Sequence, residues 1–179
     1  SMVLPWQLNE SYPNAWCTSV VDYRGEPKPA YHAVARAFAP TRITARTGRF
    51  AWAGHDRASV TAWLWSEPGV SGASTVWIRA RNANGEVTAE RTVGVADVRE
   101  PRPVDSLEVD LTGMSEFFAW DLAWYGADGE LIDRDIQLAS RSDSFTAVLD
   151  EPATIGVATG LVGDTVHVTV SHSGGPMAV

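Results

Sequence analysis

The chain has 179 residues, a formal net charge of −8 and 45% hydrophobic residues. This length allows one or two domains, each with a buried core. The excess of acidic side chains disfavours a nucleic-acid partner, because affinity for nucleic acids depends on clustered Lys and Arg. No apolar run approaches the roughly 20 residues that span a bilayer, so we expect no membrane partner either.

The first forty residues predict one strand and one helix. Residues 3–8 form a short apolar run typical of a buried strand, and residues 10–26 are rich in turn formers. Pro29 suits the first turn of a helix, and an apolar stripe with helical spacing follows it. Pro40 is expected to end this helix, since proline cannot continue the hydrogen-bond ladder. The members of the stripe are Tyr31, Val34, Ala35 and Phe38.

From residue 41 onward the apolar pattern changes from helical to alternating. Seven segments of alternating residues, separated by turn signals, are predicted to be strands. Seven strands in about 100 residues describe an immunoglobulin-like antiparallel β-sandwich, which we expect over residues 41–140. The predicted strands cover residues 43–52, 59–65, 75–81, 86–95, 107–111, 117–125 and 130–138.

Two dipeptides specify tight hairpins within this region. Asn84-Gly85 and Asp128-Gly129 each lie between two predicted strands. Both dipeptides tolerate the positive φ angles of a type I′ turn, which is therefore the predicted geometry.

The last forty residues predict a linker and a further hairpin. Residues 141–152 are polar and contain a proline, and residues 153–159 and 165–171 then alternate again. These two strands are interpreted as the incomplete start of a second Ig-like sandwich. Two strands alone are marginally stable in water, so we expect them to pair with the first sandwich or to be poorly ordered.

Two motifs near the N-terminus carry a family resemblance. The chain contains Trp6-Gln7-Leu8-Asn9-Glu10 and, further on, Lys28-Pro29-Ala30-Tyr31. They resemble the last strand and last helix of the catalytic barrel in β-mannosidase-like glycoside hydrolases of family 2, where a Trp-Gln-Leu-Asn-Asp run precedes a Lys-Pro-x-Tyr helix. The resemblance implies that residues 1–40 are the C-terminal end of a truncated (β/α)8 barrel, placed before a mainly β segment.

The resemblance also implies a function for the parent protein. Retaining glycosidases use two carboxylates about 5 to 5.5 Å apart, and in this family both are glutamates on earlier barrel strands. We therefore expect the isolated chain to be inactive. The parent would hydrolyse a β-mannoside or a related β-glycoside, with glucosamine or galactose as open alternatives. The segment would buttress the parent catalytic barrel, its partner in the same polypeptide, and help to shape the sugar pocket.

Two residues at the barrel motif, Trp6 and Asn9, are candidates for a role at the sugar. By resemblance, Trp6 would form an apolar floor under the sugar, since function gathers at the C-terminal ends of barrel strands; core packing is the alternative. Asn9 would bind a sugar hydroxyl or fix a loop, against a simple Asx turn. Glu10 is interpreted as a loop carboxylate that accepts hydrogen bonds, not as a catalytic group.

The remaining tryptophans leave a second hypothesis open. Trp63 and Trp65, like Trp120 and Trp124, are an even number of residues apart and so share a face of a strand. Such pairs suit a sandwich core or a domain interface. An exposed pair would instead form a sugar platform, and the chain would then be a free-standing carbohydrate-binding or adhesion module.

No cofactor or metal is expected. The four histidines show no metal-ligand spacing, and the single cysteine, Cys17, has no identified base near it. The run His55-Asp56-Arg57 suggests an ion-paired turn. The localisation stays open. Without the rest of a barrel, the apolar surface of residues 1–38 is expected to pack on the sandwich or to cause self-association.

Overall fold

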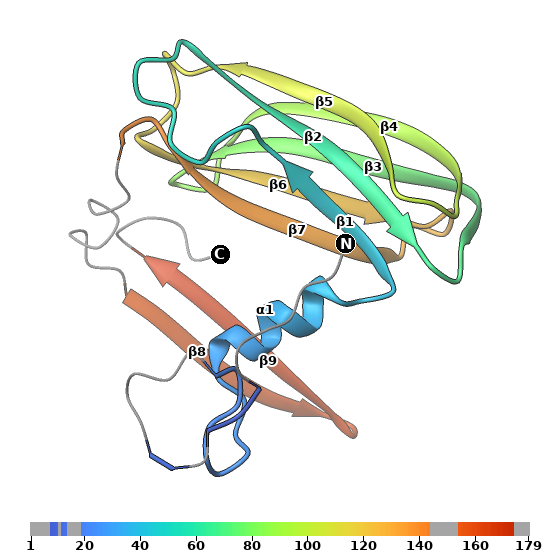
Figure 1. Ribbon diagram of the computed structural model, residues 1–179, viewed down its shortest axis with the longest axis vertical. Coiled ribbons are helices and arrows are strands. Elements are labelled where there is room, and N and C mark those ends of the chain that lie inside the picture. Colours follow the sequence, from blue (N-terminus) through green and yellow to red (C-terminus); the bar gives the residue numbers. More distant parts are fainter. Residues whose placement is uncertain (1–7, 11, 14–18, 144–153, 174–179) are drawn as a thin grey trace. The chain divides into compact units, whose positions relative to one another are not determined.

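The computed structural model describes residues 8–10, 12–13, 19–143 and 154–173 (Figure 1). The fold is mainly β, with antiparallel sheets, as predicted. It divides into two compact units, residues 1–40 and residues 41–179. None of the described helices is long and apolar enough to cross a membrane. The elements are α1 (Pro29–Ala37), β1 (Thr41–Arg46), β2 (Arg57–Ser66), β3 (Val70–Asn82), β4 (Val87–Val98), β5 (Arg102–Asp110), β6 (Phe117–Tyr125), β7 (Leu131–Ser140), β8 (Thr154–Val162) and β9 (Thr165–Ser173).

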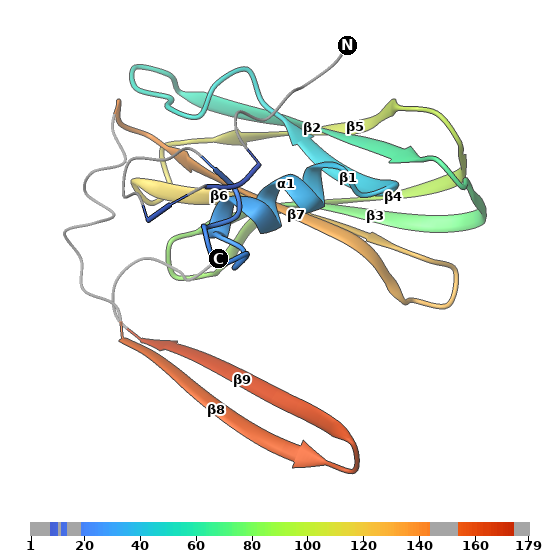
Figure 2. The ribbon, with the colours of Figure 1, turned by 60° about the horizontal axis from the view of Figure 1, so that its bottom comes forward.

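Strands β1 to β7 form a two-layered antiparallel sandwich. One sheet has the order β1-β2-β5 and the other has the order β4-β3-β6-β7, and Figure 2 shows the two layers nearly edge-on. Every predicted strand of this region is present. The first one is shorter than predicted and ends at Arg46; Ala51 instead bridges Ser140 at the end of β7.

The core lies between the two sheets because the strands alternate as the sequence predicts. In β2 every second residue from Ala58 to Ser66 is buried, and the same holds in β3 from Ser74 to Ala80. Each large apolar side chain removed from water in this way contributes roughly 1.5 to 3 kcal/mol. The largest fully buried apolar side chains include Ile43, Leu64, Ile78, Phe118, Trp120, Leu122 and Trp124.

The open edge between β1 and β7 is closed by side chains instead of a backbone ladder. The amide of Ile43 donates to Asp133 Oδ2, and the amide of Ala45 donates to Asp135 Oδ2, each at 2.8 Å. Gln137 Nε2 donates to the carbonyl of Ala45 at 2.9 Å. Polar side chains directed inward from an edge strand occupy backbone groups that would otherwise be free to pair with another chain.

Both predicted hairpin tips lie at turns, but the predicted turn type is wrong. At the first tip the Gly85 amide donates to the carbonyl of Asn82 at 2.9 Å, and Gly85 has a positive φ of +85°.

 At the second tip Gly129 has a φ of +82°, and neither Asn84 nor Asp128 has a positive φ. Each tip is therefore a three-residue loop, a type I turn followed by a left-handed glycine. The Asn84 and Asp128 side chains instead accept the amide two residues on, each at 3.0 Å.

In the first unit, the predicted helix is confirmed as α1. Pro29 occupies its first turn, Phe38 caps its C-terminal end, and the helix stops before Pro40. No residue of α1 is buried. The predicted apolar stripe is therefore largely exposed, with Tyr31 at 42% and Phe38 at 62%.

The last two strands, β8 and β9, form a separate two-stranded sheet, so they do not pair with either sheet of the sandwich. Their turn is Gly163-Asp164, with φ +60° at Gly163, as in a type II′ turn. No residue of either strand is buried. One face of this hairpin is apolar and carries Ile155, Val157, Leu161, Val166, Val168 and Val170.

Candidate functional site

Of the two residues predicted to contact sugar, only Asn9 belongs to the described residues. Trp6 lies outside the described residues, so its role as a pocket floor stays a prediction. Asn9 is exposed, and its backbone forms an isolated parallel bridge with Val21. The amide of Val21 donates to the carbonyl of Leu8 at 2.9 Å, which holds the end of the motif beside the following loop.

Glu10, next to Asn9, is a buried carboxylate with partners of its own. It is 6% exposed, and its Oε1 accepts a hydrogen bond from the Ser19 hydroxyl at 2.9 Å. It also forms an ion pair with Lys28, the residue directly before α1 and the one lysine of the chain. These contacts tie the motif to the start of the helix. Glu10 thus acts as a hydrogen-bond acceptor that fixes a loop, as its predicted role requires.

One tryptophan pair of the sandwich belongs to the core. Trp120 and Trp124 are both fully buried on the inner face of β6. Trp124 Nε1 donates to the Ser74 hydroxyl at 3.0 Å, and that hydroxyl donates to the carbonyl of Val95 at 3.0 Å. This pair cannot form an exposed sugar platform, and the core interpretation is correct for it.

The other predicted pair, Trp63 and Trp65, lies on the outer face of the three-stranded sheet. Both side chains are partly buried and alternate with the fully buried Ala62, Leu64 and Ser66 of the same strand. The Arg46 guanidinium lies over the Trp63 ring, 4.8 Å from its centroid. A cation over an aromatic ring holds both side chains in place.

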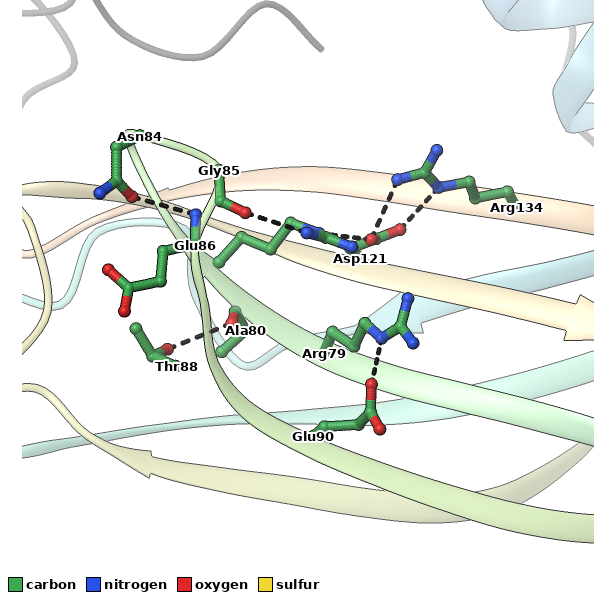
Figure 3. Close-up of polar contacts among 10 residues, drawn as sticks. Arg79, Ala80, Asn84, Gly85, Glu86, Thr88, Glu90, Asp121 and Arg134 are labelled. Atoms are coloured by element: carbon green, nitrogen blue, oxygen red, sulfur yellow. Dashed lines mark hydrogen bonds and ion pairs between the residues drawn. The ribbon is translucent and has the colours of Figure 1, made fainter.

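The outer face of the four-stranded sheet holds an acidic group between two arginines (Figure 3). Asp121 of β6 is 2% exposed and accepts a hydrogen bond from Arg81 Nε at 2.6 Å. Arg134 donates to the same carboxylate through two nitrogens, at 2.7 and 3.0 Å. Burial by itself raises the pKa of Asp121, but the hydrogen bonds from Arg134 and Arg81 outweigh burial and hold this pKa below its usual range.

A further aromatic pair on this face was not predicted from the sequence. Trp77 of β3 and Tyr125 of β6 have ring centroids 4.7 Å apart and ring planes inclined at 49°. The alternating pattern of the sequence places each residue on the outward face of its strand. The sequence did not show that β3 pairs with β6, which brings the two rings together.

The predicted ion-paired turn at His55-Asp56-Arg57 is not formed as expected. Arg57 pairs with Glu108 of β5, and His55 contacts Arg49. Among the described residues, no group of three or more His, Cys, Asp or Glu side chains is placed to hold a metal ion. Cys17 lies outside them.

Comparison with known proteins finds similarity to parts of larger proteins. No family model matches the chain. A curated protein, β-mannosidase B of Aspergillus niger, is 44% identical over 50 residues, which are 27% of this chain and 6% of that protein. The solved exo-chitosanase of Amycolatopsis orientalis matches with a TM-score of 0.60 and 15% identity over 96% of this chain. The β-D-mannosidase of Dictyoglomus thermophilum matches with a TM-score of 0.61 and 14% identity over 93%.

These matches differ in what they establish. At 14% and 15% identity, the solved structures establish a shared fold. The chain spans 22% of the exo-chitosanase chain and 19% of the mannosidase chain. The likeness is therefore to a part of each larger protein.

Proposed function

We propose that this chain is a non-catalytic C-terminal part of a retaining, β-mannosidase-like glycoside hydrolase of family 2. The observation that carries the proposal is the combination of the motif at Trp6 to Glu10 with a sandwich shared with two glycosidases. The 44% identity to a β-mannosidase over 50 residues supports the same parent. The substrate of the parent is a β-mannoside or a related β-glycoside.

Within that parent, the first unit supplies the wall of the sugar pocket. Trp6 lies under the sugar ring, and Asn9 binds a sugar hydroxyl or fixes the adjoining loop. The buried Glu10–Lys28 pair supports this proposal, because it fastens the segment that carries both residues to the start of α1. A residue that positions a binding side chain must itself be held by its neighbours.

The second unit contributes no catalytic group in this proposal and buttresses the catalytic barrel. The apolar face of the β8–β9 hairpin supports the further proposal that it begins a second sandwich. Its members are 58% to 70% exposed, and an isolated two-stranded hairpin is marginally stable. A second sheet would cover this face, as the two sheets of the first sandwich cover each other.

An activity assay on the purified chain tests this function. We expect no hydrolysis of aryl β-mannoside, β-galactoside or β-glucosaminide at high protein concentration, because both catalytic glutamates lie on other barrel strands. Turnover that survives repurification and is abolished by Glu10→Gln would refute the non-catalytic assignment.

A further inference from the structure

The aromatic pair Trp77 and Tyr125 forms one wall of a hollow on the sandwich. The antiparallel register places Tyr125 opposite Thr75 and Trp77 opposite Ala123, so the two rings are diagonal neighbours. Diagonal side chains on one sheet face are within reach of each other when they are aromatic. The small side chain of Ala123 leaves the Trp77 ring free to lean toward Tyr125.

The rest of the hollow is built by the β6–β7 turn. Its volume is about 370 Å³, and its lining residues are Thr75, Trp77, Tyr125, Gly126, Ala127 and Gly129. Ligand pockets begin at about 300 Å³, so the hollow suits one small ring.

Two glycines of the turn keep this hollow open. Gly129 has a φ of +82°, which closes the turn without a side chain over the hollow. A Cβ atom at Gly126 would lie 2.9 Å from Asp128 Oδ1. The glycine therefore lets this carboxylate fold back onto the amide of Glu130, at 3.0 Å. Asp128 thereby stays out of the lining.

The Trp77 ring is held in position before any ligand arrives. The Arg79 guanidinium lies over it, 4.0 Å from the ring centroid, and Arg79 pairs with Glu90 of β4 (Figure 3). Contacts of this kind immobilise the ring in the free protein. Binding then costs less conformational entropy, because the wall is already ordered.

We propose that this hollow binds a neutral pyranose. Its walls are aromatic, and its other lining groups are a hydroxyl, small side chains and turn backbone, with no charged side chain among them. A pyranose has an apolar C–H face, which suits the electron-rich face of an aromatic ring, and hydroxyls at its edge that hydrogen-bond to polar groups. The Arg79 guanidinium beside the hollow already pairs with Glu90, so a charged ligand would lose its hydration without gaining a free counter-ion. The inference does not depend on the proposed function, since it requires neither a barrel nor catalysis.

Titration of the full chain with methyl β-D-mannopyranoside and methyl β-D-glucopyranoside, followed by NMR, tests the inference. We expect saturable shifts of the Trp77 indole N–H and of the Gly126 and Gly129 amides. Tyr125→Ala should weaken binding at least about tenfold, equivalent to about 1.4 kcal/mol. Trp63→Ala is the matched control, because Trp63 is also an outward tryptophan under an arginine, and it should leave binding unchanged.

Three results would overturn the inference. The first is the absence of saturable shifts at these three residues for either glycoside in the wild-type chain, which requires no variant to fold. The second is equal binding of D-glucuronate, since recognition would then not depend on a neutral ligand. The third is shifts at Trp77 with a polyproline peptide and none with either glycoside, because the hollow would then be a peptide site.

Discussion

The sandwich and the β8–β9 hairpin use the same alternating strands but reach opposite degrees of burial. In β2, five of the ten residues are buried in strict alternation, whereas β8 and β9 bury none of theirs. β9 carries valines at every second position, and β8 carries Ile155, Val157 and Leu161 on the same face, so both strands show the alternation of the core strands. The difference is that each sheet of the sandwich is covered by another sheet, and the described hairpin forms a sheet of its own.

This contrast shows that alternation specifies a strand and its two faces but supplies no stability by itself. Stabilisation comes from the area removed from water, at roughly 25 cal/mol per Å². A sheet with one apolar face obtains this stabilisation only when a second layer covers that face. The contrast can be measured by substituting similar residues in the two regions.

The largest expected effect comes from a matched pair of leucines. Leu64 is 1% exposed in β2, and Leu161 is 70% exposed in β8. We expect Leu64→Ala to lower the free energy of unfolding by about 2 to 5 kcal/mol, because it leaves a cavity. Leu161→Ala should change it by less than about 0.5 kcal/mol. Urea denaturation followed by tryptophan fluorescence measures both, and equal losses would mean that the hairpin is covered in solution.

A smaller effect is expected at the buried polar group of the sandwich. Asp121 has a lowered pKa, so its stabilising effect is complete above the unfolded-state value of about 3.9 and is lost as the pH falls through the folded-state value. Asp121→Asn should cost about 1 to 2 kcal/mol near pH 7. The cost should shrink on acidification below about pH 4.

Unfolding free energies measured between neutral and acidic pH test this expectation. Leu161→Ala serves as the control, because it removes no ionisable group and should keep the wild-type pH profile. A cost of Asp121→Asn that stays constant over the whole range would show that ionisation of Asp121 does not contribute to stability.

The smallest expected effect separates two buried tryptophans on one strand. Trp124 Nε1 has a hydrogen bond to Ser74, while Trp120 Nε1 is buried without a partner in the described part of the chain. Replacing either residue with Phe removes similar volume, so the cavity terms are comparable. Trp124→Phe should therefore cost about 1 kcal/mol more than Trp120→Phe. Thermal unfolding compares the two variants, and a larger cost at Trp120 would reveal a hydrogen-bond partner there.

Much of the local structure was predictable from the sequence. The strands of the sandwich follow from apolar residues at every second position, and the end of α1 follows from Pro40. The hairpin tips follow from their Asn-Gly and Asp-Gly dipeptides. Their turn type did not follow, because the same dipeptides suit a two-residue and a three-residue loop, and strand register chooses between them.

The candidate site was predictable to a smaller extent. The motif at Asn9 and Glu10 identified the segment, but the partners of Glu10 lie 9 and 18 residues away and are found only by folding. The even spacing in sequence showed that Trp63 and Trp65 share one strand face and that Trp120 and Trp124 share a face of another strand. In β6 both faces carry apolar residues, so this spacing did not show that Trp120 and Trp124 point inward. In β2 the face of Trp63 and Trp65 also carries Arg57, Ser59 and Thr61, which indicates an outward face.

The sequence alone determined the repeat of apolar residues. This repeat shows where the chain is helical, where it is extended, and which residues share a face. These are properties of neighbouring residues, and backbone geometry fixes them locally. The tertiary structure decided which faces meet. The hydrogen bonds from β1 to Asp133 and Asp135, the contact of Arg81 with Asp121 and the Trp77–Tyr125 hollow each join strands far apart in the chain. Such contacts depend on sheet order and register, which the packing of the whole core selects.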